Sequence, residues 1–91
     1  MTEIRKNEER SRYELLVEGE VVGYLSYVAG EDAIDLPHTV VDPAHGGKGY
    51  AAELVRHGLD DIREQGKKVI PTCSYVAGYI QKHPEYEDLL Q

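Results

Sequence analysis

A glycine-rich stretch in the middle of the chain is the part whose residue types most clearly suggest chemistry. Residues 46–51 have the sequence GGKGYA and fall between an expected strand and an expected helix. Glycines at such a junction let the backbone approach a ligand closely, and the first free N–H groups of a helix point out of its N-terminus. The helix dipole adds positive potential at the same place. The stretch therefore predicts a site for a phosphate or pyrophosphate group.

Two common phosphate-binding loops do not fit this stretch. A Walker loop in this register needs glycine at position 42 and serine or threonine at position 49, where the chain has Asp42 and Gly49. Residues 47–52 satisfy a loose Rossmann pattern, but Thr72 and Cys73 stand where an acidic ribose ligand belongs, and the chain is too short for a doubly wound sheet. A turn that only reverses the chain is the simple alternative, although three glycines and a lysine exceed what a turn requires.

Cys73 is the only thiol, and it stands between an expected strand and an expected helix that starts near Ser74. A cysteine at a helix N-terminus tends toward a lowered thiol pKa and a more reactive thiolate. Free cysteines are also among the most buried small residues, so packing is the alternative role. Spacing alone favours the packing role.

His38 shares a face of an expected strand with Ile34, Leu36 and Val40. A histidine on an apolar strand face is either a satisfied core group or, as a group that titrates near neutrality, a general base. No pair of histidines has the helical spacing of metal ligands, so the sequence predicts no bound metal.

The elements that position these residues follow from hydrophobic periodicity. Alternation predicts strands over residues 13–18, 21–28, 34–41 and 69–71, and residues 1–12 form either an edge strand or a disordered lead-in. Pro37 makes the third strand an edge or a bulged strand. A continuous apolar stripe from Ala51 to Ile62 predicts a helix that stops at Gly66, and a second helix spans residues 74–82 and ends before Pro84. The expected fold class is α+β, in which an antiparallel hairpin leads into a β-α-β crossover, with a mixed sheet and two helices.

Composition limits the class of protein. The chain has 91 residues, of which 41% are hydrophobic, and a formal charge of -7. This length fits a single domain over residues 1–91 and excludes a dehydrogenase or a kinase. The negative charge argues against nucleic acid as a partner, and one cysteine excludes a disulfide scaffold. The chain has no apolar run of about 18 residues and a charged N-terminus, so we expect no membrane span, no signal peptide and a cytoplasmic location.

Residues 41–51 (VDPAHGGKGYA), followed by residues 54–55, resemble the acetyl-CoA pyrophosphate loop of the GNAT superfamily of N-acetyltransferases. Residues 38–86 are similar, more narrowly, to the minimal single-domain branch of that superfamily, which lacks the usual C-terminal strands. The superfamily loop usually opens with arginine or glutamine. This chain has Gly46 there, so one side chain that would face a phosphate is missing.

The resemblance implies that strands 34–41 and 69–71 splay to admit acetyl-CoA, whose acetyl group passes to an amine. It implies that Cys73 faces the thioester, as nucleophile or as proton donor to the leaving CoA thiolate, with His38 as the candidate base. The positions that it assigns to cofactor binding are Val40, Val41, Gly46, Gly47, Lys48, Gly49, Tyr50, Ala51, Tyr79 and Lys82.

The residues leave several alternatives open. Lys48 faces a phosphate or is an exposed loop residue, and Tyr79 and Lys82 contact the cofactor or are a core tyrosine beside a solvated lysine. A non-catalytic CoA-binding or protein-interaction domain with the same fold is the rival hypothesis, favoured by Gly46 and by the lack of a secure general base. The negative charge fits a cationic acceptor such as a polyamine or a lysine, and serves solubility equally well. The sequence is silent on the oligomeric state.

Overall fold

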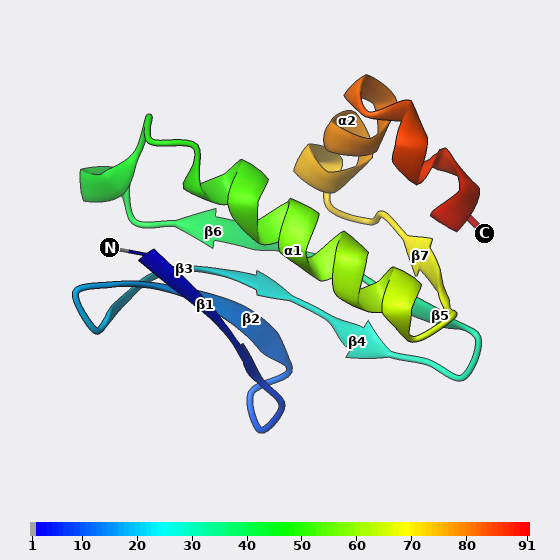
Figure 1. The fold of residues 1–91 in the computed structure, drawn as a ribbon, viewed down its shortest axis with the longest axis horizontal. Helices are drawn as coiled ribbons and strands as arrows, with labels where there is room; N and C mark the ends of the chain where they lie inside the picture. The colour runs from blue at the N-terminus through cyan, green and yellow to red at the C-terminus, as the bar shows by residue number, and fades with distance from the viewer. Residues whose placement is uncertain (1) are drawn as a thin grey trace.

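Helix α1 lies across one face of two small β-sheets in the computed structural model, which describes residues 2–91 (Figure 1). In chain order the elements are β1 (Thr2–Asn7), β2 (Arg12–Val17), β3 (Glu20–Ser26), β4 (Val28–Ala29), β5 (Ala33–Asp35), β6 (Thr39–Val41), the 3₁₀ helix η1 (Pro43–His45), α1 (Tyr50–Glu64), β7 (Lys68–Ile70), α2 (Ser74–Lys82) and the 3₁₀ helix η2 (Pro84–Leu89).

Strand pairing confirms the α+β class and the hairpin that leads into a crossover. Four antiparallel strands pair in the order β1-β2-β3-β6, and a second sheet has the order β4-β5-β7, in which β5 and β7 are parallel. The expected mixed sheet is thus divided into an antiparallel sheet and a smaller mixed one. Glu18 and Gly19 connect β2 to β3 with φ of 51° and 80°, the left-handed pair that a tight hairpin turn needs. Residues 2–7 form the edge strand, the first of the two alternatives for this segment.

Pro37 divides the predicted strand 34–41 between the two sheets. Before it, the Leu36 N–H donates to the Ile70 carbonyl at 3.0 Å, whereas after it the His38 carbonyl accepts the Ser26 N–H at 2.9 Å. Proline has no N–H to bond either neighbour, so the chain changes partner at this residue.

This division corrects the prediction that four residues share one face. Ile34 and Leu36 are buried as expected, but His38 is exposed and Val40 is 43% exposed. The alternation of faces does not continue through the break at Pro37, because the residues after it belong to a different sheet. His38 is therefore not a core histidine.

Helix α1 buries the predicted apolar stripe against the sheets. Its buried residues are Leu54, Val55, Gly58, Leu59 and Ile62. Gly58 permits a close approach, because a Cβ at this position would lie 2.6 Å from Cδ2 of Leu25. The helix stops at Gly66 as predicted, and this glycine has φ of 71°, a left-handed conformation that commonly ends helices.

Helix α2 has the predicted bounds, Ser74–Lys82, and ends at His83 before Pro84. The chain then forms η2 beside α2, and Leu90 bridges Val69 of β7, so the C-terminal segment lies along that strand. None of the helices in residues 2–91 has the length and apolar character that crossing a bilayer requires.

Candidate active site

Cys73 lies at the N-terminus of α2, where the two sheets part. Its N–H donates to the carbonyl of Leu36 at 2.9 Å, one residue before the chain turns away at Pro37. Its Sγ lies 3.5 Å from Oγ1 of Thr39, the first residue of β6, and either atom can donate the proton. This contact joins the segment after β7 to β6 across the opening between the sheets. The free thiol is half-buried.

The surroundings lower the pKa of the Cys73 thiol below its ordinary value. Burial is the largest influence and acts in the opposite direction, but the hydrogen bond with Thr39 and the N–H groups of Val76 and Tyr75 together outweigh it. The Cys73 side chain makes no capping hydrogen bond, so these two N–H groups act on the sulfur as oriented dipoles of the helix terminus. The environment thus favours the thiolate, which is the nucleophilic form.

The glycine stretch leads directly into α1. Gly47 and Gly49 have φ of 76° and 79°, which other residues rarely adopt, and Gly49 is the N-cap residue. The Gly49 carbonyl accepts the N–H of Glu53 at 3.1 Å, so the N–H groups of residues 50–52 have no partner within the helix. A Cβ at Gly47 or Gly49 would have no heavy atom of the described chain within 4 Å. The space beside these two glycines is therefore open.

A groove of about 510 Å³ lies between α1 and α2 and reaches Ser74, the residue after Cys73. Its lining residues are Ala52, Glu53, Arg56, Ser74, Tyr75, Gly78, Tyr79, Lys82 and His83. Arg56 on one helix and Lys82 on the other supply positive charge. The Tyr79 ring stacks on the His83 ring with centroids 4.0 Å apart, and burial raises the pKa of Tyr79. The tyrosine therefore forms a rigid wall of the groove.

Strand β6 offers an unpaired edge to the opening. It is the terminal strand of its sheet, and the backbone groups of His38 and Asp42 bond to β3. Bonds to one neighbour alternate along an antiparallel strand, so Val40 bonds β3 as well, whereas Thr39 and Val41 direct their N–H and C=O groups to the free edge. Thus Val41 presents its backbone to the opening, whereas Val40 presents only an exposed side chain on the outer face.

The structure brings some of the predicted residues together and separates others. Cys73 contacts Thr39 rather than His38, which is exposed on the segment between β5 and β6. Lys48 is exposed in the loop, while Tyr79 and Lys82 line the groove.

Sequence reasoning assigned no role to Thr39 or Arg56. Pro37 is the feature of the sequence that could have pointed to Thr39. A proline that interrupts a strand changes which side chains of the following residues face the opening between the sheets. Arg56 lies off the apolar stripe of α1, and only the packing of α2 shows that it borders a groove. No group of three or more histidine, cysteine, aspartate or glutamate side chains within residues 2–91 is arranged to hold a metal ion.

A family whose description is GCN5-related N-acetyl-transferase matches residues 12–89 of the chain. The chain belongs to this family. Protein NATD1 of Mus musculus is 36% identical over 64 residues, which cover 68% of this chain and 58% of that protein. The chain thus matches less than two thirds of the length of this curated relative.

Solved structures of GCN5-related acetyltransferases share the fold. A GCN5-like protein from Staphylococcus aureus superposes with a TM-score of 0.75 at 24% identity, over 98% of this chain and 87% of that one. A GNAT family acetyltransferase from Brucella melitensis, solved in complex with acetyl-CoA, has a TM-score of 0.61 at 22% identity, over 75% of this chain and 50% of that one. The family match confirms the resemblance to the GNAT superfamily, and these structures confirm the fold that the resemblance implied.

Proposed function

We propose that this protein transfers the acetyl group of acetyl-CoA to an amine, within one domain that spans residues 1–91. The observation that carries the proposal is the change of strand partner at Pro37, which separates β6 from the segment that follows β7. The glycine stretch follows β6, and Cys73 follows β7. An opening with a phosphate site on one side and an activated thiol on the other suits a long thioester cofactor.

Backbone groups and two cations would hold the cofactor. The pyrophosphate would accept hydrogen bonds from the N–H groups of residues 47–51, where the dipole of α1 adds positive potential. Arg56 and Lys82 in the groove would pair with phosphate oxygens. The amide groups of the pantetheine arm would add to the free edge of β6 at Thr39 and Val41, as an extended peptide adds to a sheet. The acetyl-CoA complex of the Brucella melitensis family member supports this choice of cofactor.

Cys73 would take part in acetyl transfer by one of two routes, as a proton donor or as a nucleophile. In direct transfer, the amine nitrogen attacks the thioester carbon, the carbon–sulfur bond breaks, and Cys73 gives its proton to the departing CoA thiolate. In the acyl-enzyme route, the Cys73 thiolate attacks, CoA thiolate leaves, and the amine then displaces the cysteine sulfur. The lowered pKa of Cys73 favours the second route because it raises the thiolate fraction. In both routes His38, exposed beside Thr39, would remove the amine proton.

Asp35 is a candidate for binding a cationic acceptor. Its Oδ1 is excluded from solvent and has no hydrogen-bond partner among the described residues. Asp35 lies directly between Val28 and Ile70 on one sheet face, and these neighbours are 59% and 39% exposed. It precedes Leu36, whose carbonyl bonds the Cys73 N–H. A carboxylate in an apolar surround gains from an ammonium partner, which favours a polyamine or a lysine as acceptor.

An acetyl-transfer assay tests the proposal. Wild type and Cys73→Ala would be mixed with acetyl-CoA and either cationic amines or neutral amines of similar size, and acetylated product would be measured by mass spectrometry. We expect turnover of the cationic amines, at least roughly tenfold slower in Cys73→Ala, with CoA affinity unchanged. An acetylated form of the wild-type protein that Cys73→Ala lacks would assign the acyl-enzyme route.

Two outcomes would contradict the proposal. Binding of acetyl-CoA without turnover of any amine would favour the non-catalytic CoA-binding module. In a thermal-shift comparison, stabilisation by NAD or ATP and not by acetyl-CoA would overturn the cofactor assignment, because a ligand of the native state raises its melting temperature.

A further inference from the structure

The outer edge of β1 is a free strand edge on the side of the sheet opposite the proposed active site. β1 is one terminal strand of the four-stranded sheet, and β6 is the other. Figure 1 shows β1 in dark blue as the last strand of its sheet. A regular strand edge exposes rows of N–H and C=O groups that template pairing with another chain.

The hydrogen-bond pattern shows which backbone groups of β1 face that edge. Ser11 bonds Tyr27 and, by register, the odd-numbered residues of β2 bond β3. The even-numbered residues of β2 therefore bond β1, through their register partners Glu3, Arg5 and Asn7. It follows that residues 2, 4 and 6 of β1 direct their N–H and C=O groups away from the sheet.

Two of the usual protections of an edge strand, a proline and a bulge, are absent from β1. It contains no proline, and its register with β2 runs without a bulge from residue 2 to residue 7. Its one lysine, Lys6, points to the helix side, where Nζ lies 3.1 Å from Oδ2 of Asp61. The lysine therefore lies on the helix face of the sheet, whereas Glu3 and Arg5 carry the charges of the outer face.

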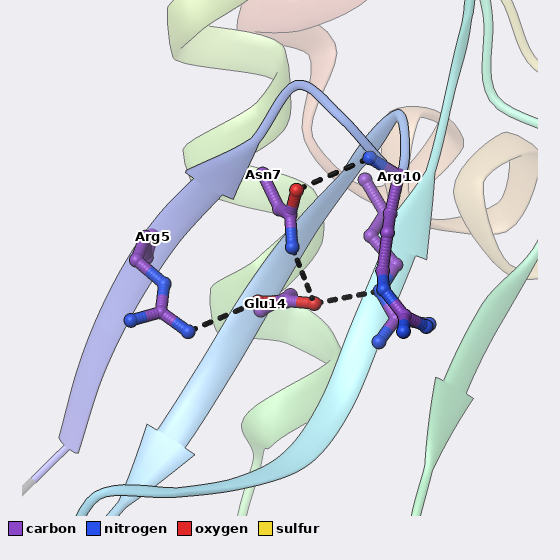
Figure 2. Close-up of polar contacts among 5 residues, drawn as sticks. Arg5, Asn7, Arg10 and Glu14 are labelled. Atoms are coloured by element: carbon purple, nitrogen blue, oxygen red, sulfur yellow. Dashed lines mark hydrogen bonds and ion pairs between the residues drawn. The ribbon is translucent and has the colours of Figure 1, made fainter.

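The outer-face side chains of β1 lie beside a buried carboxylate. Figure 2 shows Arg5 and Asn7 directed toward Glu14, with which they form hydrogen bonds of 3.3 and 3.2 Å. Arg12 completes the cluster at 2.8 Å. Burial acts to raise the pKa of Glu14, but the hydrogen bonds from Arg12, Arg5 and Asn7 lower it overall. The cluster fixes the direction of Arg5, whose side chain is still 55% exposed and keeps N–H donors free.

The charges of β1 are self-complementary about Ile4. In an antiparallel pair of two β1 strands with Ile4 opposite Ile4, Glu3 of each copy lies opposite Arg5 of the other. A shift of two residues in either direction sets Glu3 against Glu3 or Arg5 against Arg5, and like charges directly opposite are destabilising. A shift of one residue places residues of one copy whose N–H and C=O groups already bond β2 opposite residues of the other copy whose groups are free. Such residues cannot exchange hydrogen bonds. Of the registers within two residues of this one, only the register with Ile4 opposite Ile4 satisfies both the charges and the backbone.

We propose that β1 pairs with β1 of a second copy of this chain, antiparallel, on a two-fold axis at Ile4. Residues 2, 4 and 6 would then exchange backbone hydrogen bonds, and the two Glu3–Arg5 pairs would occupy the closer, non-hydrogen-bonded positions. The two four-stranded sheets join into one, and the β6 edge of each copy stays free for the cofactor. A contact between two short strands is small, so the dimer is a weak one.

Sedimentation velocity of the wild-type chain over increasing concentration tests the proposal, with two variants and one control. Glu3→Lys places two positive charges opposite each other, whereas Glu9→Lys makes the same charge change at an exposed residue of the β1–β2 turn. We expect Glu3→Lys to weaken the dimer at least roughly tenfold and Glu9→Lys to leave it unchanged. Ile4→Pro removes an N–H that bonds nothing within the sheet, and should abolish the dimer.

Amide hydrogen exchange tests the same contact in the wild-type chain, so its result does not depend on whether the variants fold. The N–H groups of Ile4 and Lys6 should gain protection as the concentration of the chain rises, while that of Arg5 should be protected throughout. A chain that stays monomeric up to about 1 mM would overturn the proposal. A dimer that withstands both Glu3→Lys and Ile4→Pro, with Ile4 and Lys6 exchanging freely, would also overturn it, because the contact would then use another surface.

Discussion

Replacing Gly49 by alanine separates the ligand-binding role of the glycine stretch from its backbone role. Gly49 has φ of +79° at the N-terminus of α1, and Gly66 has φ of +71° just after its C-terminus. A Cβ at either position would have no heavy atom of the described chain within 4 Å. The two glycines are therefore matched in backbone strain and in local space, but only Gly49 lies at the proposed phosphate site.

The strain is the same for both substitutions and acts on the free energy of unfolding. A left-handed conformation costs an L-residue about 1–2 kcal/mol. The reduced freedom of the unfolded chain offsets about 0.4–1 kcal/mol of that cost. We therefore expect Gly49→Ala and Gly66→Ala each to lose about 1 kcal/mol of stability, which lowers Tm by about 4–8 °C in a domain of this size.

The effect on CoA affinity should differ between the two variants. A methyl group at Gly49 would occupy open space at the residue that leads into α1, and we expect it to keep a phosphate from approaching the backbone there. We expect Gly49→Ala to raise the Kd for CoA at least roughly tenfold, or about 1.4 kcal/mol, and Gly66→Ala to leave it unchanged. Thermal unfolding and calorimetric CoA titration of the three proteins measure both quantities. Equal CoA affinities would refute the phosphate role, and an undiminished Tm in Gly66→Ala would refute the strain argument.

Three further predictions concern the thiol, the loop opening and the buried carboxylate. Thr39→Val removes a hydrogen bond that lowers the pKa of Cys73, so the pH profile of thiol alkylation should move to higher pH, while exposed Thr72→Val leaves it in place. An unmoved profile in Thr39→Val would contradict the electrostatic argument. Gly46 has φ of -68°, which any residue adopts, and Gly46→Arg should tighten CoA binding about threefold to tenfold in calorimetry, whereas Gly46→Glu should weaken it. The pKa of Glu14 is lowered by its partners, so its stabilising effect is complete above the unfolded-state pKa and is lost as pH falls through the lower folded-state value. Glu14→Gln should cost about 1–3 kcal/mol at pH 7 and give a flatter loss of stability on acidification, and a denaturation profile parallel to that of wild type would contradict this account.

The helices were predictable because their signals are local. The apolar stripe of α1 and its stop at Gly66 follow from residue spacing alone, and Pro84 limits α2. The hairpin was predictable for the same reason, since Gly19 lies between two alternating runs. Each of these features depends on residues that are near one another in the sequence, and periodicity detects such features well.

The division of strand 34–41 and the contact at the thiol were not predictable from local pattern. Pro37 marked an irregular strand, but the choice of β7 before it and β3 after it depends on segments that are distant in sequence. Thr39 and Cys73 are 34 positions apart, and only the change of sheet at Pro37 brings them together. The exposure of His38 follows from the same change. Alternation along a strand predicts faces only while the strand keeps one partner.

Amide NMR of the isotope-labelled protein, titrated with acetyl-CoA, tests most directly the claim that the opening between β6 and the segment after β7 receives the cofactor. We expect the largest shift changes at residues 47–51, at Thr39 and Val41, and at Cys73, with small changes along β1. Shift changes confined to other parts of the chain, or none at millimolar acetyl-CoA, would contradict it.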